Sequence, residues 1–599
     1  MKRKGIVRSM AAYIGQYKLP SIITPLCMIV EVVFEMLIPI YMGKIIDIGV
    51  ADGDLAFIIK MGIIMLALAV GGLISGLGGA VFGAKASTGF AKNLRKGMYD
   101  NIQTFSFSNI DKFSSSGLVT RLTTDVTNVQ NAYQMLLRMA FRAPISMIVA
   151  MVCSFLLSPA IASVYLTAVV CLAIVVMILM FLAMKHFRNV FKRYDDLNES
   201  VQENVSAIRV VKAYVREDHE INKFKTACDN ICKLFMKAES KVVLNFPAMN
   251  LAIYGCMMLL CWLGAHLVTE GHVTFLGIHF SGALQVGELM TLFTFCANIL
   301  TSLMMLSMVF VMLTMSAASA ERIAEVLNEE ADIVNPDEPV MELADGSISF
   351  ENVSFAYGSD KDKAILNGIN LDIKSGETIG IIGGTGSSKT SLVNLISRLY
   401  DVTEGTVKVG GLDVKAYDLE VLRDNVAVVL QKNVLFSGTI LDNLRWGDKD
   451  ATRQQCEEAC KLACAHDFIM NFENGYDTYI EQGGTNVSGG QKQRLCIARA
   501  LLKKPKILIL DDSTSAVDTA TDAKIRTAFK ESIPGVTKLI IAQRISSVME
   551  ADRIIVMEDG RIDGFASHEQ LLATSDIYRD VYESQTGEGA DFDQAGGDL

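Results

Sequence analysis

Six long apolar stretches dominate the first half of this 599-residue chain. They lie near residues 20–43, 57–84, 137–158, 161–184, 246–268 and 287–313. Each reaches the roughly 20 residues that a helix needs to cross a bilayer. A spanning segment must satisfy its backbone polar groups internally, and a helix does this within a single stretch. The sequence therefore predicts an all-α membrane domain over residues 1–320, with six transmembrane helices.

The charges between these stretches indicate how the spans are oriented. The gaps 85–136 and 185–245 are long and rich in Lys and Arg, whereas the gaps after 43, 158 and 268 carry almost none. Because basic residues favour the cytoplasmic side, we expect both long gaps and both chain termini there. The long gaps keep a helical pattern, so the helices should continue beyond the membrane. The N-terminus has no small-residue cleavage site before the first stretch, which we interpret as a span rather than a removable signal.

Two features of the spans bear on a substrate cavity. Glu31 and Glu35 lie mid-span, one helical turn apart on one face. A carboxylate in the middle of a span costs about 2.5–3.5 kcal/mol on insertion scales, so it usually faces protein or water. Either the pair lines a cavity that attracts cationic groups, or it is satisfied internally through Arg138 or Arg142. A methionine stripe on the sixth span suits either helix packing or a pocket for varied apolar ligands; it includes Met304 and Met308.

The second half of the chain has a different pattern. A polar linker over residues 321–344 leads into short apolar strands that alternate with amphipathic helices over 345–583, which is typical of an α/β domain. The acidic end, residues 584–599, is predicted to be a disordered tail. The net charge of −11 argues against a nucleic-acid partner, because binding phosphate backbones needs a basic face.

A glycine-rich turn after one of these strands matches the phosphate-binding loop pattern G-x-x-x-x-G-K-[ST] at all but one position. In such a loop, backbone N–H groups surround the phosphates, the lysine reaches the β/γ-phosphates of ATP, and the final hydroxyl binds Mg²⁺. Ser388 stands where the pattern has glycine, and it fits if its φ is negative. The predicted loop consists of Gly383, Gly384, Thr385, Gly386, Ser387, Ser388, Lys389 and Thr390.

A buried strand, KILILDD, ends in two adjacent carboxylates, Asp511 and Asp512. Ligands of open α/β sheets bind at the carboxyl ends of the strands. We expect Asp511 to share a Mg²⁺ ion with Thr390, and Asp512 to stand where a general base would act.

A second anion-binding turn, VSGGQ, precedes another predicted helix. A Ser-Gly-Gly turn that caps a helix presents backbone N–H groups to an anion. One nucleotide does not need both devices from one chain, so we expect each nucleotide to lie between two nucleotide domains. The turn contains Ser488, Gly489, Gly490 and Gln491.

Together these motifs resemble a half-size ATP-binding cassette (ABC) exporter of the type I exporter fold, in which a six-helix membrane domain precedes one P-loop nucleotide-binding domain. The resemblance covers nearly the whole chain. It implies that Tyr357 stacks on adenine, that Gln431 touches Mg²⁺ or water, and that VSGGQ binds the γ-phosphate of the opposite nucleotide. Asp518 would end the D-loop SAVD. The segments 111–126 and 207–218 resemble loops that carry coupling helices.

The chain departs from this family at two catalytic positions. Asp512 replaces the usual glutamate base, which retracts the carboxylate by about 1.5 Å, the length of one C–C bond. Gln543 replaces the histidine of the switch, and an amide cannot carry a positive charge. Both changes predict slow hydrolysis or none at this site. The hypothesis is a heterodimer, in which a second half-transporter supplies glutamate and histidine to the site that uses this chain's VSGGQ.

The resemblance further implies a multi-pass protein of a bacterial cell membrane that exports hydrophobic or amphipathic compounds, lipids or peptides, as in multidrug-type exporters. Three alternatives stay open. The chain could form a homodimer with two slow sites, act as an ATP-binding regulator without transport, or import its substrate on the same fold.

Overall fold

The structure is a computed structural model that describes residues 3–275, 278–281, 284–358, 363–513 and 515–586. The chain forms two compact units. The first comprises Met1–Gln103 and Ser116–Glu329, and the second comprises Thr104–Ser115 and Glu330–Leu599. A short segment from the middle of the membrane half thus belongs to the nucleotide unit. Residues 587–599, most of the predicted tail, lie outside the described residues.

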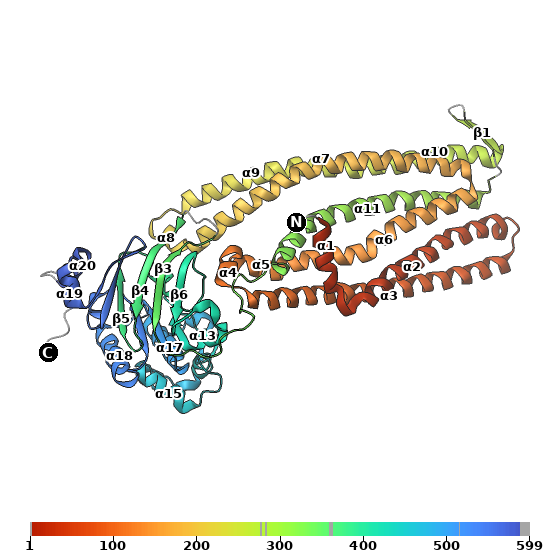
Figure 1. Cartoon of the computed structure of the whole chain (residues 1–599). Coiled ribbons are helices and arrows are strands. Elements are labelled where there is room, and N and C mark those ends of the chain that lie inside the picture. Colours follow the sequence, from red (N-terminus) through yellow and green to blue (C-terminus); the bar gives the residue numbers. More distant parts are fainter. Residues whose placement is uncertain (1–2, 276–277, 282–283, 359–362, 514, 587–599) are drawn as a thin grey trace. The chain divides into compact units, whose positions relative to one another are not determined.

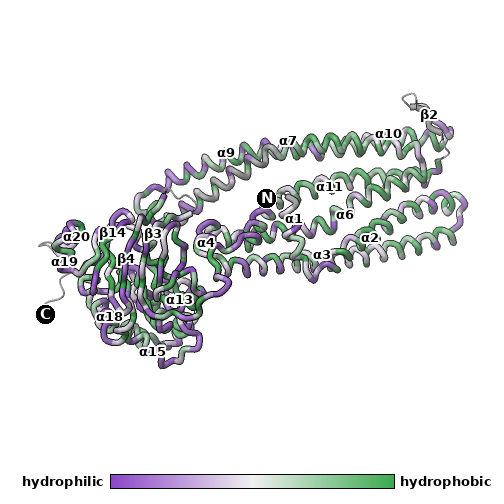
Figure 2. Tube along the Cα trace, in the orientation of Figure 1, coloured by the Kyte–Doolittle hydropathy of each residue, from purple (hydrophilic) through white to green (hydrophobic). Residues whose placement is uncertain are grey.

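The first unit consists of long helices, several short ones and one hairpin (Figure 1). Six helices in the described chain are long and apolar enough to cross a membrane, which confirms the predicted six-helix architecture. Figure 2 shows mostly hydrophobic residues along α10 and α11, whereas α9 carries more hydrophilic ones. The helices run well past the apolar stretches, as predicted. The elements are α1 (Arg3–Ala11), α2 (Lys18–Lys44), α3 (Leu55–Thr104), α5 (Ser115–Thr120), α6 (Val126–Leu157), α7 (Pro159–Ser206), α8 (Ile208–Ala213), α9 (Glu217–Val243), α10 (Asn245–Thr269), β1 (His272–Phe275), β2 (Ile278–Ser281) and α11 (Val286–Leu327).

The first and last spans approach each other closely at two glycines. A Cβ built on Gly287 of α11 would lie 2.2 Å from the Gly43 carbonyl oxygen of α2, so only glycine fits there. Asp47 accepts a 2.6 Å hydrogen bond from the Gly287 N–H, and the Thr291 hydroxyl donates to the Pro39 carbonyl at 2.9 Å. The Asp47 contact satisfies an N–H of the first turn of α11, which has no partner within the helix.

The second unit contains a six-stranded and a four-stranded sheet. The six-stranded sheet has the order β14-β13-β5-β12-β11-β8, in which all neighbours are parallel except β13 and β14. The four-stranded sheet is antiparallel, with the order β4-β3-β6-β7. The strands are β3 (Ile348–Phe355), β4 (Leu366–Ile373), β5 (Thr378–Gly383), β6 (Glu404–Val409), β7 (Leu412–Asp413), β8 (Val426–Val429), β9 (Gly438–Thr439), β10 (Tyr479–Ile480), β11 (Ile507–Asp511), β12 (Thr537–Ile541), β13 (Arg553–Glu558) and β14 (Arg561–Ala566).

Two apolar cores hold this unit together. One packs both sheets around the helix α12, and the other packs the parallel sheet against α15, α17, α18 and α20. The strand β11 is fully buried, as its unbroken apolar run predicts for a parallel strand with both faces covered. The fold class is therefore the predicted one, a six-helix membrane domain followed by an α/β nucleotide domain. The helices are α4 (Phe107–Phe113), α12 (Lys389–Ile396), α13 (Leu419–Asn425), α14 (Ile440–Leu444), α15 (Arg453–Leu462), α16 (His466–Met470), α17 (Gly489–Leu502), α18 (Thr519–Ser532), α19 (His568–Thr574) and α20 (Asp576–Thr586).

Candidate nucleotide site

The phosphate loop connects β5 to the N-terminus of α12, at the carboxyl edge of the parallel sheet. Its lysine lies folded over the loop. Lys389 Nζ donates to the carbonyl oxygens of Gly383 and Gly384, both at 2.8 Å, and lies 3.1 Å from Ser387 Oγ. Burial lowers the pKa of Lys389, and the nearby carboxylates of Asp511 and Asp512 partly offset this. The ammonium group can therefore exchange its loop oxygens for those of a phosphate.

The backbone conformation of Ser388 differs from the predicted one. Its φ is +70°, in the left-handed region, whereas its fit to the loop was expected to need a negative φ. The backbone keeps the conformation that the glycine of the motif would adopt, and the serine bears the steric strain. This strain costs an L residue roughly 1–2 kcal/mol. The loop geometry, set by β5 and α12, prevails over the local preference of one residue.

The predicted metal-binding pair is brought together at the end of β11. The Thr390 hydroxyl donates to Asp511 Oδ2 at 2.9 Å. Burial raises the pKa of the Asp511 carboxyl, and the Thr390 hydrogen bond opposes this rise. These oxygens suit Mg²⁺, which usually takes one or two protein ligands and completes its shell with phosphate oxygens and water. Among the described residues there is no group of three or more His, Cys, Asp or Glu that could hold a metal ion.

Asp512 directly follows Asp511, and its side chain points toward Gln543, the residue at the switch position. Its φ is +48°, and its Oδ2 accepts a 2.9 Å hydrogen bond from Gln543 Nε2. Burial raises the pKa of Asp512, while hydrogen bonds from Gln431 and Gln543 lower it. Three predicted site residues, from three separate loops, thus meet at one carboxylate.

Tyr357, the predicted adenine-stacking residue, follows β3 and is 45% exposed. Its hydroxyl lies 3.0 Å from Ser391 Oγ, one residue past Thr390. Its ring meets the Tyr400 ring edge-on, with centroids 5.0 Å apart. The tyrosine is therefore tied to the phosphate-loop helix and still offers ring surface to a base.

Tyr400 was not predicted, and it connects Tyr357 to the helix α4. Its hydroxyl donates to Asp111 Oδ2 at 2.7 Å, and its ring lies 5.9 Å from that of Phe107. Ser108 Oγ donates to Asp332 Oδ2 at 2.8 Å, which adds a second attachment. The predicted coupling segment 111–126 is thus divided between the units, and the part that belongs to the nucleotide unit begins earlier, at Thr104.

The signature turn caps α17 as predicted. Ser488 Oγ accepts from the Gln491 N–H at 3.3 Å, and Gln491 Oε1 accepts from the Ser488 N–H at 2.9 Å. This capping box leaves other N–H groups of the first turn available to an anion. A Cβ on Gly490 would lie 2.8 Å from the Ala516 carbonyl oxygen, so glycine is needed where the turn meets the D-loop. Gly489 lies between these residues.

Asp518 has a role that the D-loop pattern did not reveal. Its Oδ1 accepts from the Thr521 N–H at 2.9 Å and caps α18. This hydrogen bond lowers the pKa of the exposed carboxyl. Gln493 of α17, also not predicted, supports the same loop: its Oε1 accepts from the Ala516 N–H at 3.0 Å.

In the membrane unit, the two mid-span carboxylates share one arginine. Arg142 of α6 donates from one terminal nitrogen to Glu31 Oε1 and from the other to Glu35 Oε2, both at 2.8 Å. The structure therefore shows an internal ion pair with Arg142, and Arg138 takes no part in it. Met304 and Met308 are exposed on α11 and lie outside this cluster.

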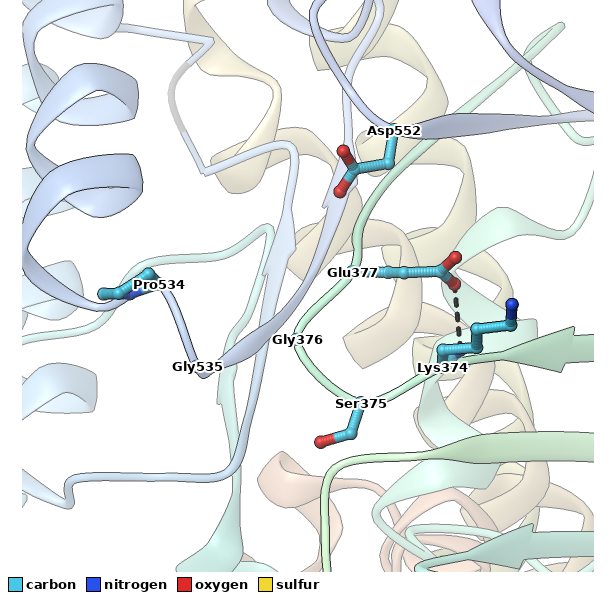
Figure 3. A pocket seen from close by; sticks show the side chains of 7 residues that line it. All are labelled: Lys374, Ser375, Gly376, Glu377, Pro534, Gly535 and Asp552. Atoms are coloured by element: carbon cyan, nitrogen blue, oxygen red, sulfur yellow. Dashed lines mark hydrogen bonds between the residues drawn. The ribbon is translucent and has the colours of Figure 1, made fainter.

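A separate hollow of about 610 Å³ opens at the opposite end of the parallel sheet, before β5, β12 and β13 (Figure 3). The two carboxylates that line it already have partners. Glu377 accepts from the Lys374 N–H at 2.8 Å and from Arg553, and Asp552 accepts from the Thr378 N–H at 2.8 Å. These groups stabilise the turns at the strand starts, away from the phosphate loop.

Comparisons with known proteins agree with this architecture. Residues 21–304 match the model of the ABC transporter transmembrane region, and residues 366–515 match that of the ABC transporter domain. The chain is 36% identical to the uncharacterized ABC transporter ATP-binding protein YfiB of Bacillus subtilis (strain 168), over 96% of this chain and 98% of YfiB. It is 34% identical to the uncharacterized ABC transporter ATP-binding protein MT1311 of Mycobacterium tuberculosis (strain CDC 1551 / Oshkosh), over 93% of this chain and 94% of that protein.

The chain therefore belongs to the ABC transporter family. It is a half-size transporter, with one membrane region and one ATP-binding domain of the kind that couples ATP hydrolysis to transport.

Proposed function

We propose that this chain is one half of a heterodimeric ATP-driven exporter, and that its own nucleotide site hydrolyses ATP slowly or not at all. One observation carries the proposal: the carboxylate in the base position is Asp512, and its Oδ2 is engaged at 2.9 Å by the neutral amide of Gln543. A general base must lie within hydrogen-bond reach of the water that it activates. A shortened carboxylate held toward the switch is poorly placed for this task, and the loss of a good base costs about 10²- to 10⁴-fold in rate.

The remaining parts of the site support nucleotide binding. Lys389 would turn from its loop oxygens to the β/γ-phosphates, and backbone N–H groups of the loop and of α12 would surround the phosphates. Thr390 and Asp511 would hold Mg²⁺, with Gln431 beside it. When bound, Mg²⁺ neutralises phosphate charge. Tyr357 would stack on the adenine through its exposed ring face. The site keeps its binding residues and changes those that serve hydrolysis.

The signature turn supports a role toward another chain. Ser488, Gly490 and Gln491 keep an ordered helix cap whose N–H groups could bind an anion, and one nucleotide does not need this device in addition to its phosphate loop. We propose that this turn completes the site of a second half-transporter, which carries glutamate and histidine at the positions of Asp512 and Gln543.

The cargo follows from family resemblance. We propose export of hydrophobic or amphipathic compounds, lipids or peptides across a bacterial cell membrane, with both termini and the nucleotide domain in the cytoplasm. The basic long gaps between the spans support this orientation. ATP hydrolysis at the partner's site would return the transporter to its starting conformation. ATP bound at this chain's site would meanwhile keep the two nucleotide domains together.

The deciding experiment is the subunit composition of the tagged chain, gently solubilised from its native membrane and weighed by intact-mass analysis. A stoichiometric second half-transporter with glutamate and histidine at the matching positions is the expected result. Recovery of this chain paired only with itself, with an ATPase activity that Asp512→Asn abolishes, would establish the homodimer with two slow sites instead. If the heterodimer transports no cargo and no cargo stimulates its ATPase activity, the alternative of an ATP-binding regulator without transport is favoured.

A further inference from the structure

The last turn of α20 holds the backbone of the switch. The Gln585 side chain uses both ends of its amide: Nε2 donates to the Gln543 carbonyl oxygen at 2.9 Å, and Oε1 accepts from the Ile545 N–H at 2.7 Å. The two contacts lie on either side of Arg544. One side chain thus holds two backbone groups of a segment about 40 residues away in the chain.

This segment needs such support because the sheet ends before it. The strand β12 ends at Ile541, and the Ala542 N–H still donates to the Ile381 carbonyl at 3.3 Å. Gln543 and Arg544 are exposed, and a short helical turn begins at Ile545. Arg544 is held by the helical turn, because its carbonyl accepts from the Ser547 N–H at 3.2 Å. Gln543 lies between the strand and this turn, and Gln585 holds its carbonyl in place.

The helix that carries Gln585 is itself anchored. Tyr578 of α20 is fully buried in the core of the nucleotide unit, and its hydroxyl lies 2.7 Å from His568 Nδ1 of α19. The Ser575 hydroxyl donates to Asp563 Oδ2 at 2.7 Å, just before the helix begins. Gln585 therefore presents its amide from a helix held by buried contacts, as a positioning group requires.

We propose that Gln585 is a positioning residue for the switch: it sets the place of the Gln543 amide and thereby the preference of the site for ATP over ADP. The proposal rests on the proposed nucleotide site and takes the Gln543 amide, whose Nε2 is a hydrogen-bond donor, as a ligand of the γ-phosphate of ATP. Because ADP lacks that phosphate, a displaced Gln543 weakens ATP binding and leaves ADP binding unchanged. The C-terminal helix thus acts on the nucleotide site without touching the nucleotide.

The test measures the affinity of the full-length chain for Mg²⁺–ATP and for Mg²⁺–ADP, by displacement of a fluorescent ADP analogue. Gln585→Ala should weaken ATP binding about 2- to 10-fold, the worth of one net hydrogen bond, with ADP affinity unchanged. Gln585→Glu retains the acceptor for Ile545 but cannot donate to Gln543, and should show the same selectivity loss. Gln570→Ala is the matched control, because this glutamine on α19 caps its own helix through the Ser567 N–H and should change neither affinity.

A double variant separates positioning from general stability. Gln543→Ala should lower the ATP preference by itself, and adding Gln585→Ala should lower it no further, because both act through one amide. An equal loss for ATP and ADP, additive effects, or an unchanged ATP preference in a folded Gln585→Ala chain would overturn the proposal. No effect of Gln543→Ala would overturn the switch assignment itself, and the proposal with it. An effect of Gln543→Ala without one of Gln585→Ala overturns only the positioning role.

Discussion

Ser388 shows how a single side chain can bear the strain of the backbone shape that a phosphate loop requires. At φ +70° its Cβ costs roughly 1–2 kcal/mol, which glycine would avoid. Ser388→Gly should therefore raise the thermal midpoint of the nucleotide domain by about 2–4 °C for each kcal/mol gained. Thermal unfolding is followed by the fluorescence of Trp446, in a Trp262→Phe background that removes the other of the two tryptophans.

Two neighbouring variants serve as controls for this prediction. Ser388→Ala keeps the Cβ and should leave the midpoint unchanged. Ser387→Ala should lower the midpoint, because the buried Ser387 hydroxyl donates to the Gly384 carbonyl at 2.8 Å. A gain in Ser388→Ala equal to that in Ser388→Gly would show that the serine hydroxyl, and not backbone strain, is the destabilising group.

At the scale of elements, α4 owes its place in the nucleotide unit to a few side chains. Tyr400→Phe removes the 2.7 Å hydrogen bond to Asp111 and keeps the ring contacts with Phe107 and Tyr357. A net hydrogen bond contributes about 1 kcal/mol, so amide hydrogen exchange over residues 107–113 should become about 5-fold faster. Tyr357→Phe, which loses only the Ser391 contact, should leave the exchange of this segment unchanged. Equal exchange in the wild type and Tyr400→Phe would mean that other contacts hold α4.

The ion pair between α2 and α6 gives a second prediction at this scale. Arg142→Leu leaves two carboxylates without a partner, and should destabilise the membrane unit by about 1–3 kcal/mol, because the groups are only partly buried. Adding Glu31→Gln and Glu35→Gln should restore most of the loss, since the carboxylates are then neutral. Thermal unfolding in detergent provides the measurement. A triple variant no more stable than Arg142→Leu would argue that the carboxylates have another partner.

The elements themselves could be predicted from sequence because each has a strong local pattern. Six apolar stretches predicted six spans, and the loop from Gly383 to Thr390 predicted a strand, a turn and a helix. The left-handed φ of Ser388 could not be predicted, because the surrounding fold imposes it. Tyr400 and Gln585 gave no signal either: their partners Asp111 and Gln543 are far away in the chain, and residues 584–599 were expected to be a disordered tail, whereas α20 continues to Thr586.

At the scale of the whole molecule, changes at Asp512 and at the signature turn should have different effects on the rate of ATP hydrolysis. In the assembled transporter, Asp512→Asn removes a base that does little work, so most of the ATPase activity should remain. Ser488→Ala removes the cap of the signature helix, which costs about 1 kcal/mol and disorders the N–H groups offered to the partner's nucleotide. That variant should lower turnover several-fold, although it leaves this chain's own phosphate loop intact. Equal losses in both variants would mean that both sites hydrolyse ATP, and the asymmetry inferred from Asp512 and Gln543 would have to be abandoned.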